Sequence, residues 1–206
     1  MDETTAQSAR AARRSQWMNW IGVLVIVAGG LAFIKMITAS PAPRDGAHRA
    51  IGTKFVALEA APLVGTEKSV SLDDLQGKVT LVNFWMPNCP YCLQELPHLA
   101  EMHRSRADRD DFKLLSLISS SPGQSDLAPL REYVEGELRR RKVELPVYTD
   151  AGGVSKEALA FSTGWEDGMP ATVVLDRHGI IRGVWNGYVP GDEKAMAALV
   201  DRLLEE

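Results

Sequence analysis

The sequence predicts an α/β fold in which helices cover both faces of a mixed β-sheet. Val79–Trp85 and Phe112–Ser119 are nearly continuous apolar runs, which are typical of strands buried on both faces. Helical spacing follows the first run at Pro90–Arg106, so strands and helices alternate along the chain. The composition is 45% hydrophobic and 24% charged, which is that of a globular protein and excludes a disordered chain.

The chain begins with a short tail, residues 1–16, and an apolar segment, residues 17–37. This segment has 21 residues and a single charge, Lys35. A helix of that length, at about 1.5 Å per residue, matches the roughly 30 Å hydrocarbon core of a bilayer. Trp17 and Trp20 lie where aromatic rings favour the headgroups, and the tail holds three arginines. We predict a single-pass anchor in the inner (cytoplasmic) membrane, with a cytoplasmic tail and the remaining chain on the periplasmic or extracytoplasmic side.

A cleaved signal peptide is the alternative interpretation of the same segment. Ile21–Ile34 has a suitable length, and Thr38–Ser40 offers small residues for cleavage. Lys35 separates the two and Pro41 follows directly, which favours the uncleaved anchor. Residues 38–50 are rich in proline and alanine and lack periodicity, so they predict a linker.

Residues 51–206 are predicted to form one domain of alternating strands and helices. The expected strands are Phe55–Glu59, Lys68–Ser71, Val79–Trp85, Phe112–Ser119, Leu145–Thr149, Thr172–Asp176 and Ile180–Trp185. The expected helices are Pro90–Arg106, Ser125–Lys142, Val154–Phe161 and Gly191–Glu205, with a further helix start at Ser71–Asp74. The formal net charge of −4 argues against nucleic acid as a partner, because phosphate binding needs clustered Lys and Arg.

The only two cysteines lie in one motif, Cys89-Pro-Tyr-Cys92, where a predicted strand leads into a predicted helix. Free N–H groups and the positive end of the helix dipole stabilise a thiolate there. Cys89 is therefore the candidate nucleophile, and Cys92, one turn into the helix, is the candidate resolving thiol. Such a pair can exchange with a substrate disulfide through a mixed disulfide.

The same two cysteines allow four other interpretations. The first is a static disulfide, which would have a structural role and no redox activity. Zinc needs about four ligands, and no second cysteine pair or histidine pair has a suitable spacing, so no metal site is predicted. A Cu(I)-binding module remains an alternative, because soft thiolates suit that ion. A thiol peroxidase would need Thr or Ser at position 86, which is Met.

Several motifs in order resemble the membrane-anchored TlpA/ResA-type thioredoxin-like proteins. These motifs are Lys78–Trp85, Cys89–Cys92, Glu95–Pro97, Gly168–Thr172 and Leu175–Ile181. The resemblance implies a thioredoxin-like α/β fold, a central mixed sheet flanked by helices. It also implies an N-terminal β-hairpin extension and a central insertion at Ser121–Pro146.

The resemblance also implies roles for individual residues. Pro170 matches a cis-proline opposite the cysteine pair, and it would present the Met169 backbone to an extended substrate. Glu95 matches a glutamate that tunes thiol acidity and exchanges protons, and its spacing predicts a position close to Cys92 on the helix surface. Asn83 replaces the buried aspartate of cytosolic thioredoxins. The residues expected to bind substrate are Met169, Trp85, Tyr91 and Pro90.

The predicted function is therefore an exported, membrane-tethered thiol-disulfide oxidoreductase that reduces protein disulfides, with apocytochrome c as one possible substrate in cytochrome c maturation. A periplasmic disulfide oxidase or isomerase is the alternative. The expected partners are protein thiols and disulfides, a transmembrane thiol electron donor, and the membrane through residues 17–37. No cofactor is expected beyond the redox-active Cys89–Cys92 disulfide.

Overall fold

The computed structural model describes residues 24, 26–31, 33–34, 42, 44–119, 126–166 and 168–206. The chain divides into two compact units, Met1–Pro41 and Ala42–Glu206. The described residues of the first unit are helical and exposed. Within the described ranges, no helix combines the length and the apolar character needed to cross a membrane. The predicted cytoplasmic tail and much of the predicted anchor, including Lys35, lie outside the described residues.

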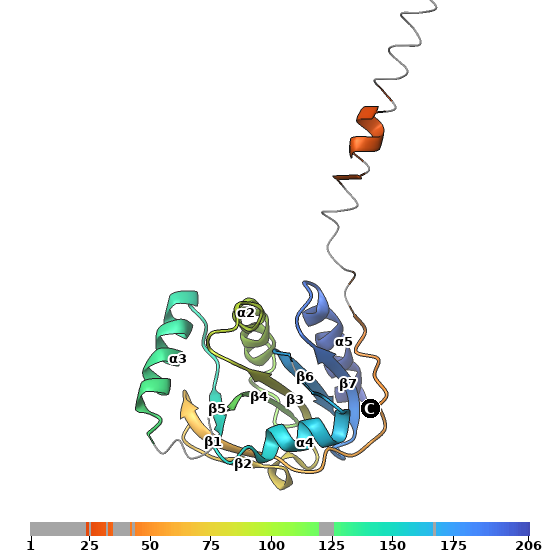
Figure 1. Ribbon diagram of the computed structural model, residues 1–206. Helices are drawn as coiled ribbons and strands as arrows, with labels where there is room; N and C mark the ends of the chain where they lie inside the picture. The colour runs from red at the N-terminus through yellow and green to blue at the C-terminus, as the bar shows by residue number, and fades with distance from the viewer. Residues whose placement is uncertain are drawn as a thin grey trace, which may run out of the picture. The chain divides into compact units, whose positions relative to one another are not determined.

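A seven-stranded sheet with the order β2-β1-β5-β4-β3-β6-β7 forms the centre of the second unit (Figure 1). Its strands are β1 (Glu59–Val64), β2 (Val70–Ser71), β3 (Val79–Trp85), β4 (Phe112–Ser119), β5 (Val147–Asp150), β6 (Ala171–Leu175) and β7 (Ile181–Asn186). β3, β4 and β5 are parallel, whereas β1, β2, β6 and β7 run antiparallel to their neighbours. The predicted mixed sheet is confirmed.

Helices cover both faces of this sheet. They are η1 (Asp73–Leu75), α2 (Pro90–Arg104), α3 (Ala128–Arg141), α4 (Val154–Thr163) and α5 (Asp192–Glu205). One core lies between the sheet and α2, α3 and α5, and includes Leu96, Leu99, Val134, Leu138, Met196 and Leu203. The core on the other face includes Phe55, Leu75, Leu159 and Trp165. Every residue of β3 is buried, as its continuous apolar run predicts.

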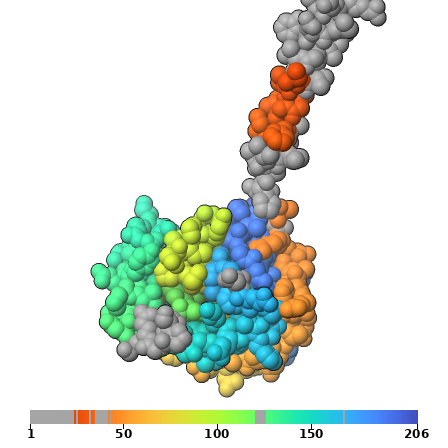
Figure 2. Space-filling model, viewed as in Figure 1, coloured from red at the N-terminus to blue at the C-terminus, as the bar shows by residue number. Residues whose placement is uncertain are grey.

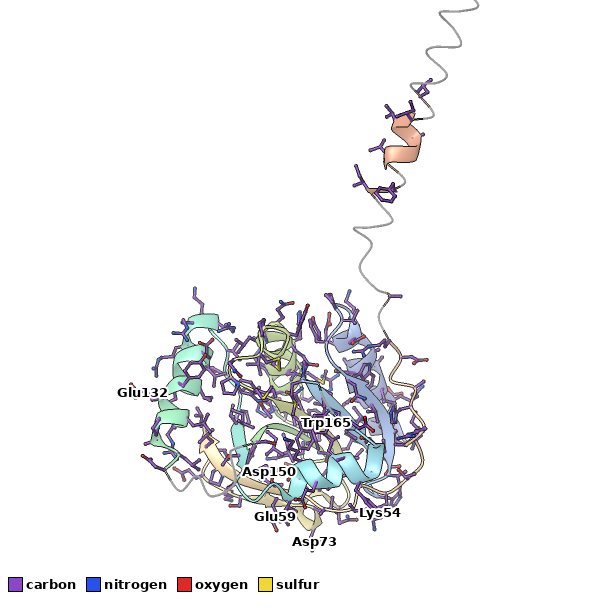
Figure 3. All side chains as sticks on the ribbon, viewed as in Figure 1. Lys54, Glu59, Asp73, Glu132, Asp150 and Trp165 are labelled. Atoms are coloured by element: carbon purple, nitrogen blue, oxygen red, sulfur yellow. A yellow bond between two sulfur atoms is a disulfide. The ribbon has the colours of Figure 1, made fainter. Side chains whose placement is uncertain are left out.

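The carboxylate of Asp150 fixes the start of α4. It accepts hydrogen bonds from the backbone N–H of Ser155 (3.2 Å) and of Lys156 (2.8 Å). The Ser155 hydroxyl donates to the backbone oxygen of Glu59 (2.8 Å), which joins α4 to β1. Figure 3 shows Asp150 and Glu59 near this end of α4, and Trp165 beside the helix. These bonds satisfy N–H groups that a helix start leaves unpaired.

One predicted strand lies mostly in a loop. Phe55–Glu59 is not the first strand of the hairpin, because β1 starts at Glu59. Phe55 is buried and its N–H donates to the Gly179 backbone oxygen (3.0 Å), so the apolar spacing there reflects packing of a loop.

The predicted linker, residues 38–50, is also too long, because residues 44–50 pack on the domain. Val184 N–H donates to Gly46 O (3.0 Å), and Ala50 is buried. Gly46 has a φ of +78°, and a Cβ there would overlap the Trp185 ring. Only glycine suits both conditions.

Candidate active site

The two cysteines lie where β3 leads into α2, in the middle of the sheet. Cys89 is the N-cap of α2, and Pro90 occupies the first turn, where its missing N–H costs nothing. The Cys92 N–H donates to Cys89 Sγ (3.2 Å). A hydrogen bond of this kind, together with the helix dipole, favours the thiolate once the pair is reduced.

Cys89 and Cys92 form a disulfide with Cα atoms 5.2 Å apart. Cys89 is partly exposed, whereas Cys92 is only 1% exposed. A substrate therefore has access to the first sulfur and not to the second. The attacking role of Cys89 and the resolving role of Cys92 stay predictions, and this difference in access supports them.

A loop that ends in a cis peptide bond faces the disulfide. The cis bond joins Met169 to Pro170, and Met169 O lies 3.5 Å from Cys89 Sγ. The neighbouring strands set this distance, because β6 pairs with β3 in the register Phe84↔Ala171. The Met169 carbonyl is thus placed where an extended peptide could align beside the reactive sulfur.

The spacing of Glu95 predicts a position on the helix surface. In the structure Glu95 instead lies in the core beneath α2. Its side chain accepts a hydrogen bond from Asn83 Nδ2 (2.8 Å) on β3. Thr172 Oγ1, on β6, donates to the other carboxylate oxygen (3.5 Å) and accepts from Asn83 Nδ2 (2.9 Å). The residue is only 1% exposed, so a solvated helix carboxylate is excluded.

Burial raises the pKa of Glu95 to about 8 because removal from water disfavours the charged form. The hydrogen bonds from Asn83 and Thr172 oppose this shift, while the negative charges of Asp192 and Glu193 add to it. The net result is a buried acid that holds its proton near neutral pH. Such a group suits proton exchange with a thiol.

Replacing Glu95 by glutamine should flatten the pH dependence of stability. The folded-state pKa is raised from 4.5 to about 8, so this group stabilises the fold fully below 4.5. That contribution is lost as the pH rises through about 8, at up to about 1.4 kcal/mol per pH unit. Urea unfolding between pH 5 and 9 measures the slope. The exposed Glu101→Gln on the same helix is the control, and an unchanged slope in Glu95→Gln would contradict the assignment.

The residues expected to bind substrate differ in their access to solvent. Tyr91 is 60% exposed, Pro90 is exposed and Met169 is partly exposed, so all three can contact a partner. Trp85 is fully buried and its indole N–H donates to Ser116 Oγ (2.7 Å). Trp85 cannot contact a substrate, and that prediction is wrong because β3 is covered on both faces.

Two residues that act on Glu95 were not foreseen as site residues. Thr172 belongs to the motif that resembles the family, but its contact with Glu95 depends on the β3–β6 pairing. Asp192 is predicted only as part of a helix, yet it is fully buried and raises the pKa of Glu95. Across the described part of the chain, no group of three or more His, Cys, Asp or Glu side chains could hold a metal ion.

Comparisons with known proteins agree with this geometry. The chain is 24% identical over 176 residues to the thiol-disulfide oxidoreductase ResA of Halalkalibacterium halodurans, which covers 85% of this chain and 88% of ResA. It is 29% identical over 145 residues to the "Probable thiol:disulfide interchange protein DsbE-2" of Pasteurella multocida, which covers 70% of this chain and 68% of that protein.

A solved structure and a family model complete the comparison. The structure is a thioredoxin-family thiol:disulfide interchange protein from Chlorobium tepidum, with a TM-score of 0.56 and 21% identity, over 81% of this chain and 99% of that chain. It shows the thioredoxin-like fold. The family model described as Redoxin matches residues 50–200. The predicted resemblance to thioredoxin-like thiol-disulfide oxidoreductases is confirmed, and the chain belongs to the Redoxin family.

Proposed function

We propose that this protein is an exported, membrane-tethered oxidoreductase that reduces protein disulfides with the Cys89–Cys92 dithiol. One observation carries the proposal. The partly exposed Cys89 sulfur caps α2, accepts the Cys92 N–H and lies 3.5 Å from Met169 O beside a cis-proline. The arrangement combines an activated nucleophile with a backbone position for the substrate.

The reaction transfers two electrons from the dithiol to the substrate disulfide. The Cys89 thiolate attacks one substrate sulfur, a mixed disulfide forms, and the other substrate sulfur leaves as a thiolate. The Cys92 thiolate then attacks Cys89 Sγ, which releases the second substrate thiolate and forms the Cys89–Cys92 disulfide. The substrate thiolates take up protons, and Cys92 must lose one.

In its carboxylate form, Glu95 is the base that we assign to the removal of the Cys92 proton. It follows Cys92 by three residues on α2, a spacing that brings two helix positions together. Both residues are 1% exposed, so bulk water is not the direct proton acceptor for Cys92. The pKa of Glu95, raised by burial to about 8, is close to that of an ordinary thiol, which suits transfer in either direction.

The tether and the electron donor complete the proposed cycle. Residues 17–37 have the length, aromatic flank and low charge of a single-pass anchor. A reductase in an oxidising compartment needs electrons from across the membrane, so its donor is a transmembrane thiol protein. Similarity to ResA-type proteins supports a protein disulfide substrate, and we propose the CxxCH motif of apocytochrome c.

Redox equilibration with glutathione tests the direction of the reaction. Reduced and oxidised full-length protein are separated by alkylation after equilibration at fixed glutathione ratios. We expect a potential below about −200 mV, the range of reducing thiol proteins. A value near about −120 mV is that of a strong oxidant and would support the oxidase alternative instead.

A further inference from the structure

Arg44, in the segment predicted as a linker, makes a set of long-range contacts at the end of β7. Its guanidinium donates to the backbone oxygens of Asn186 (2.6 Å) and Gly187 (2.8 Å). The same group donates to the Asp192 carboxylate through Nε (3.1 Å) and Nη2 (2.5 Å). Figure 2 shows this first part of the domain, in orange, beside the blue C-terminal part. One side chain thus joins three positions about 140 residues further along the chain.

Asp192 needs this partner because it is fully buried at the start of α5. Its carboxylate also accepts the backbone N–H of Arg44 (2.7 Å) and of Val189 (3.1 Å). Arg44 forms the ion pair that compensates the buried charge. Removing one partner of such a pair leaves a charge without compensation, which is strongly unfavourable.

The contacts of Arg44 continue to the cis-proline loop. Gly187, whose oxygen accepts from Arg44, donates its own N–H to Pro170 O (2.7 Å). Asn186 is the ladder partner of Ala171, the residue after that proline. Two hydrogen bonds therefore lead from the Arg44 guanidinium to the loop that faces Cys89.

Arg44 also acts on the surroundings of Glu95 through Asp192. Ionisable groups that interact electrostatically with Glu95 lie on α5 and in the loop before it, and His98 follows Glu95 by three residues on α2. Asp192 and Glu193 both raise the pKa of Glu95. Glu193 accepts from the Tyr188 hydroxyl (3.1 Å), and the Tyr188 ring stacks on His98. Within this group, Arg44 is the cation paired with Asp192.

We propose that Arg44 is a positioning residue for thiol–disulfide exchange. It fixes the cis-proline loop through Gly187 and balances the charge of Asp192 beside the proton-exchanging Glu95. This role rests on the proposed function. It makes the stretch directly after the predicted tether a part of the active-site support.

Four full-length variants separate the two effects of Arg44. Arg44→Met removes both of them. Arg44→Met/Asp192→Asn restores the charge balance without restoring the bond to Gly187. Arg44→Lys keeps a charge but lacks the fork of donors. Arg182→Met is the matched control, because Arg182 pairs with Asp176 (3.2 Å) near the opposite end of β7.

The readout is the rate of reduction of a peptide disulfide between pH 5 and 10, with thermal unfolding measured in parallel. Arg44→Met should lose up to about 100-fold in rate, because a displacement of about 1 Å caused by a distant substitution can cost that much. Its pH profile should also move to higher pH, because the negative charge beside Glu95 is no longer balanced. The double variant should recover the wild-type pH profile but keep the loss of rate.

The outcomes distinguish this inference from the function on which it rests. The role of Arg44 would be overturned if Arg44→Met kept the wild-type rate and pH profile. It would also be overturned if Arg182→Met lost as much rate as Arg44→Met. Where Arg44→Met does not fold, the double variant decides, because it buries no uncompensated charge. A wild-type rate in the double variant then overturns the inference. Absence of exchange in the wild-type protein would instead contradict the proposed function.

Discussion

Replacing Cys89 by serine should abolish disulfide reduction, with a rate reduced to that of the reductant alone. Only Cys89 combines exposure to solvent with a capping position that favours the thiolate. A serine hydroxyl at the same place cannot form a mixed disulfide. Insulin reduction with dithiothreitol as the electron source measures the effect.

Two controls separate chemistry from folding in the Cys89→Ser experiment. Asn88→Ser changes the exposed neighbouring residue to the same side chain and should reduce insulin at the wild-type rate. Thermal unfolding of Cys89→Ser should be compared with the reduced wild-type protein, because both lack the disulfide. Residual activity above the reductant background would show that another group attacks the substrate.

Replacing Cys92 by serine should instead trap the substrate as a stable mixed disulfide. Cys89 still attacks, but no resolving sulfur remains in the core to release the product. Turnover should fall to background while a covalent adduct accumulates with one substrate per protein. Non-reducing electrophoresis followed by mass spectrometry of the adduct identifies the trapped protein.

The matched control for trapping is Cys89→Ser in the same cells. We expect adducts with Cys92→Ser and none with Cys89→Ser or with the double variant. Adducts through Cys92 in the Cys89→Ser protein would reverse the assigned roles. Trapped chains that carry a CxxCH motif would support apocytochrome c as the substrate, and other trapped chains would identify a different class.

The elements that carry the site were predictable because they depend on local patterns. β3 and β4 have the bounds that their nearly continuous apolar runs predict, since strands buried on both faces are rich in apolar residues. The apolar run of β3 ends shortly before Cys89, and helical spacing begins directly after it. This change of pattern predicts that Cys89 lies at the start of α2. The position of the proposed nucleophile could therefore be predicted from the sequence.

The support of the site depends on contacts between distant segments, which leave no local pattern. Arg44 lies in a proline-rich stretch without periodicity, and its partner Asp192 is 148 residues away. The burial of Glu95 was not predicted. Its spacing from Cys92 shows that the two residues are close on the helix, but it does not show that this side of the helix packs against the sheet. β3 was easy to predict because it is buried on both faces. The same burial prevents Trp85 from contacting a substrate.

The pairing of β3 with β6 has a consequence for the growing protein. Cys89 and Met169 are 80 residues apart in the chain, yet their contact forms only when these two strands meet. A chain made from its N-terminus exposes both thiols well before the cis-proline segment exists. We expect such a nascent chain to carry reactive sulfur without a peptide-docking site, so specific reduction starts only when the C-terminal third has folded into place.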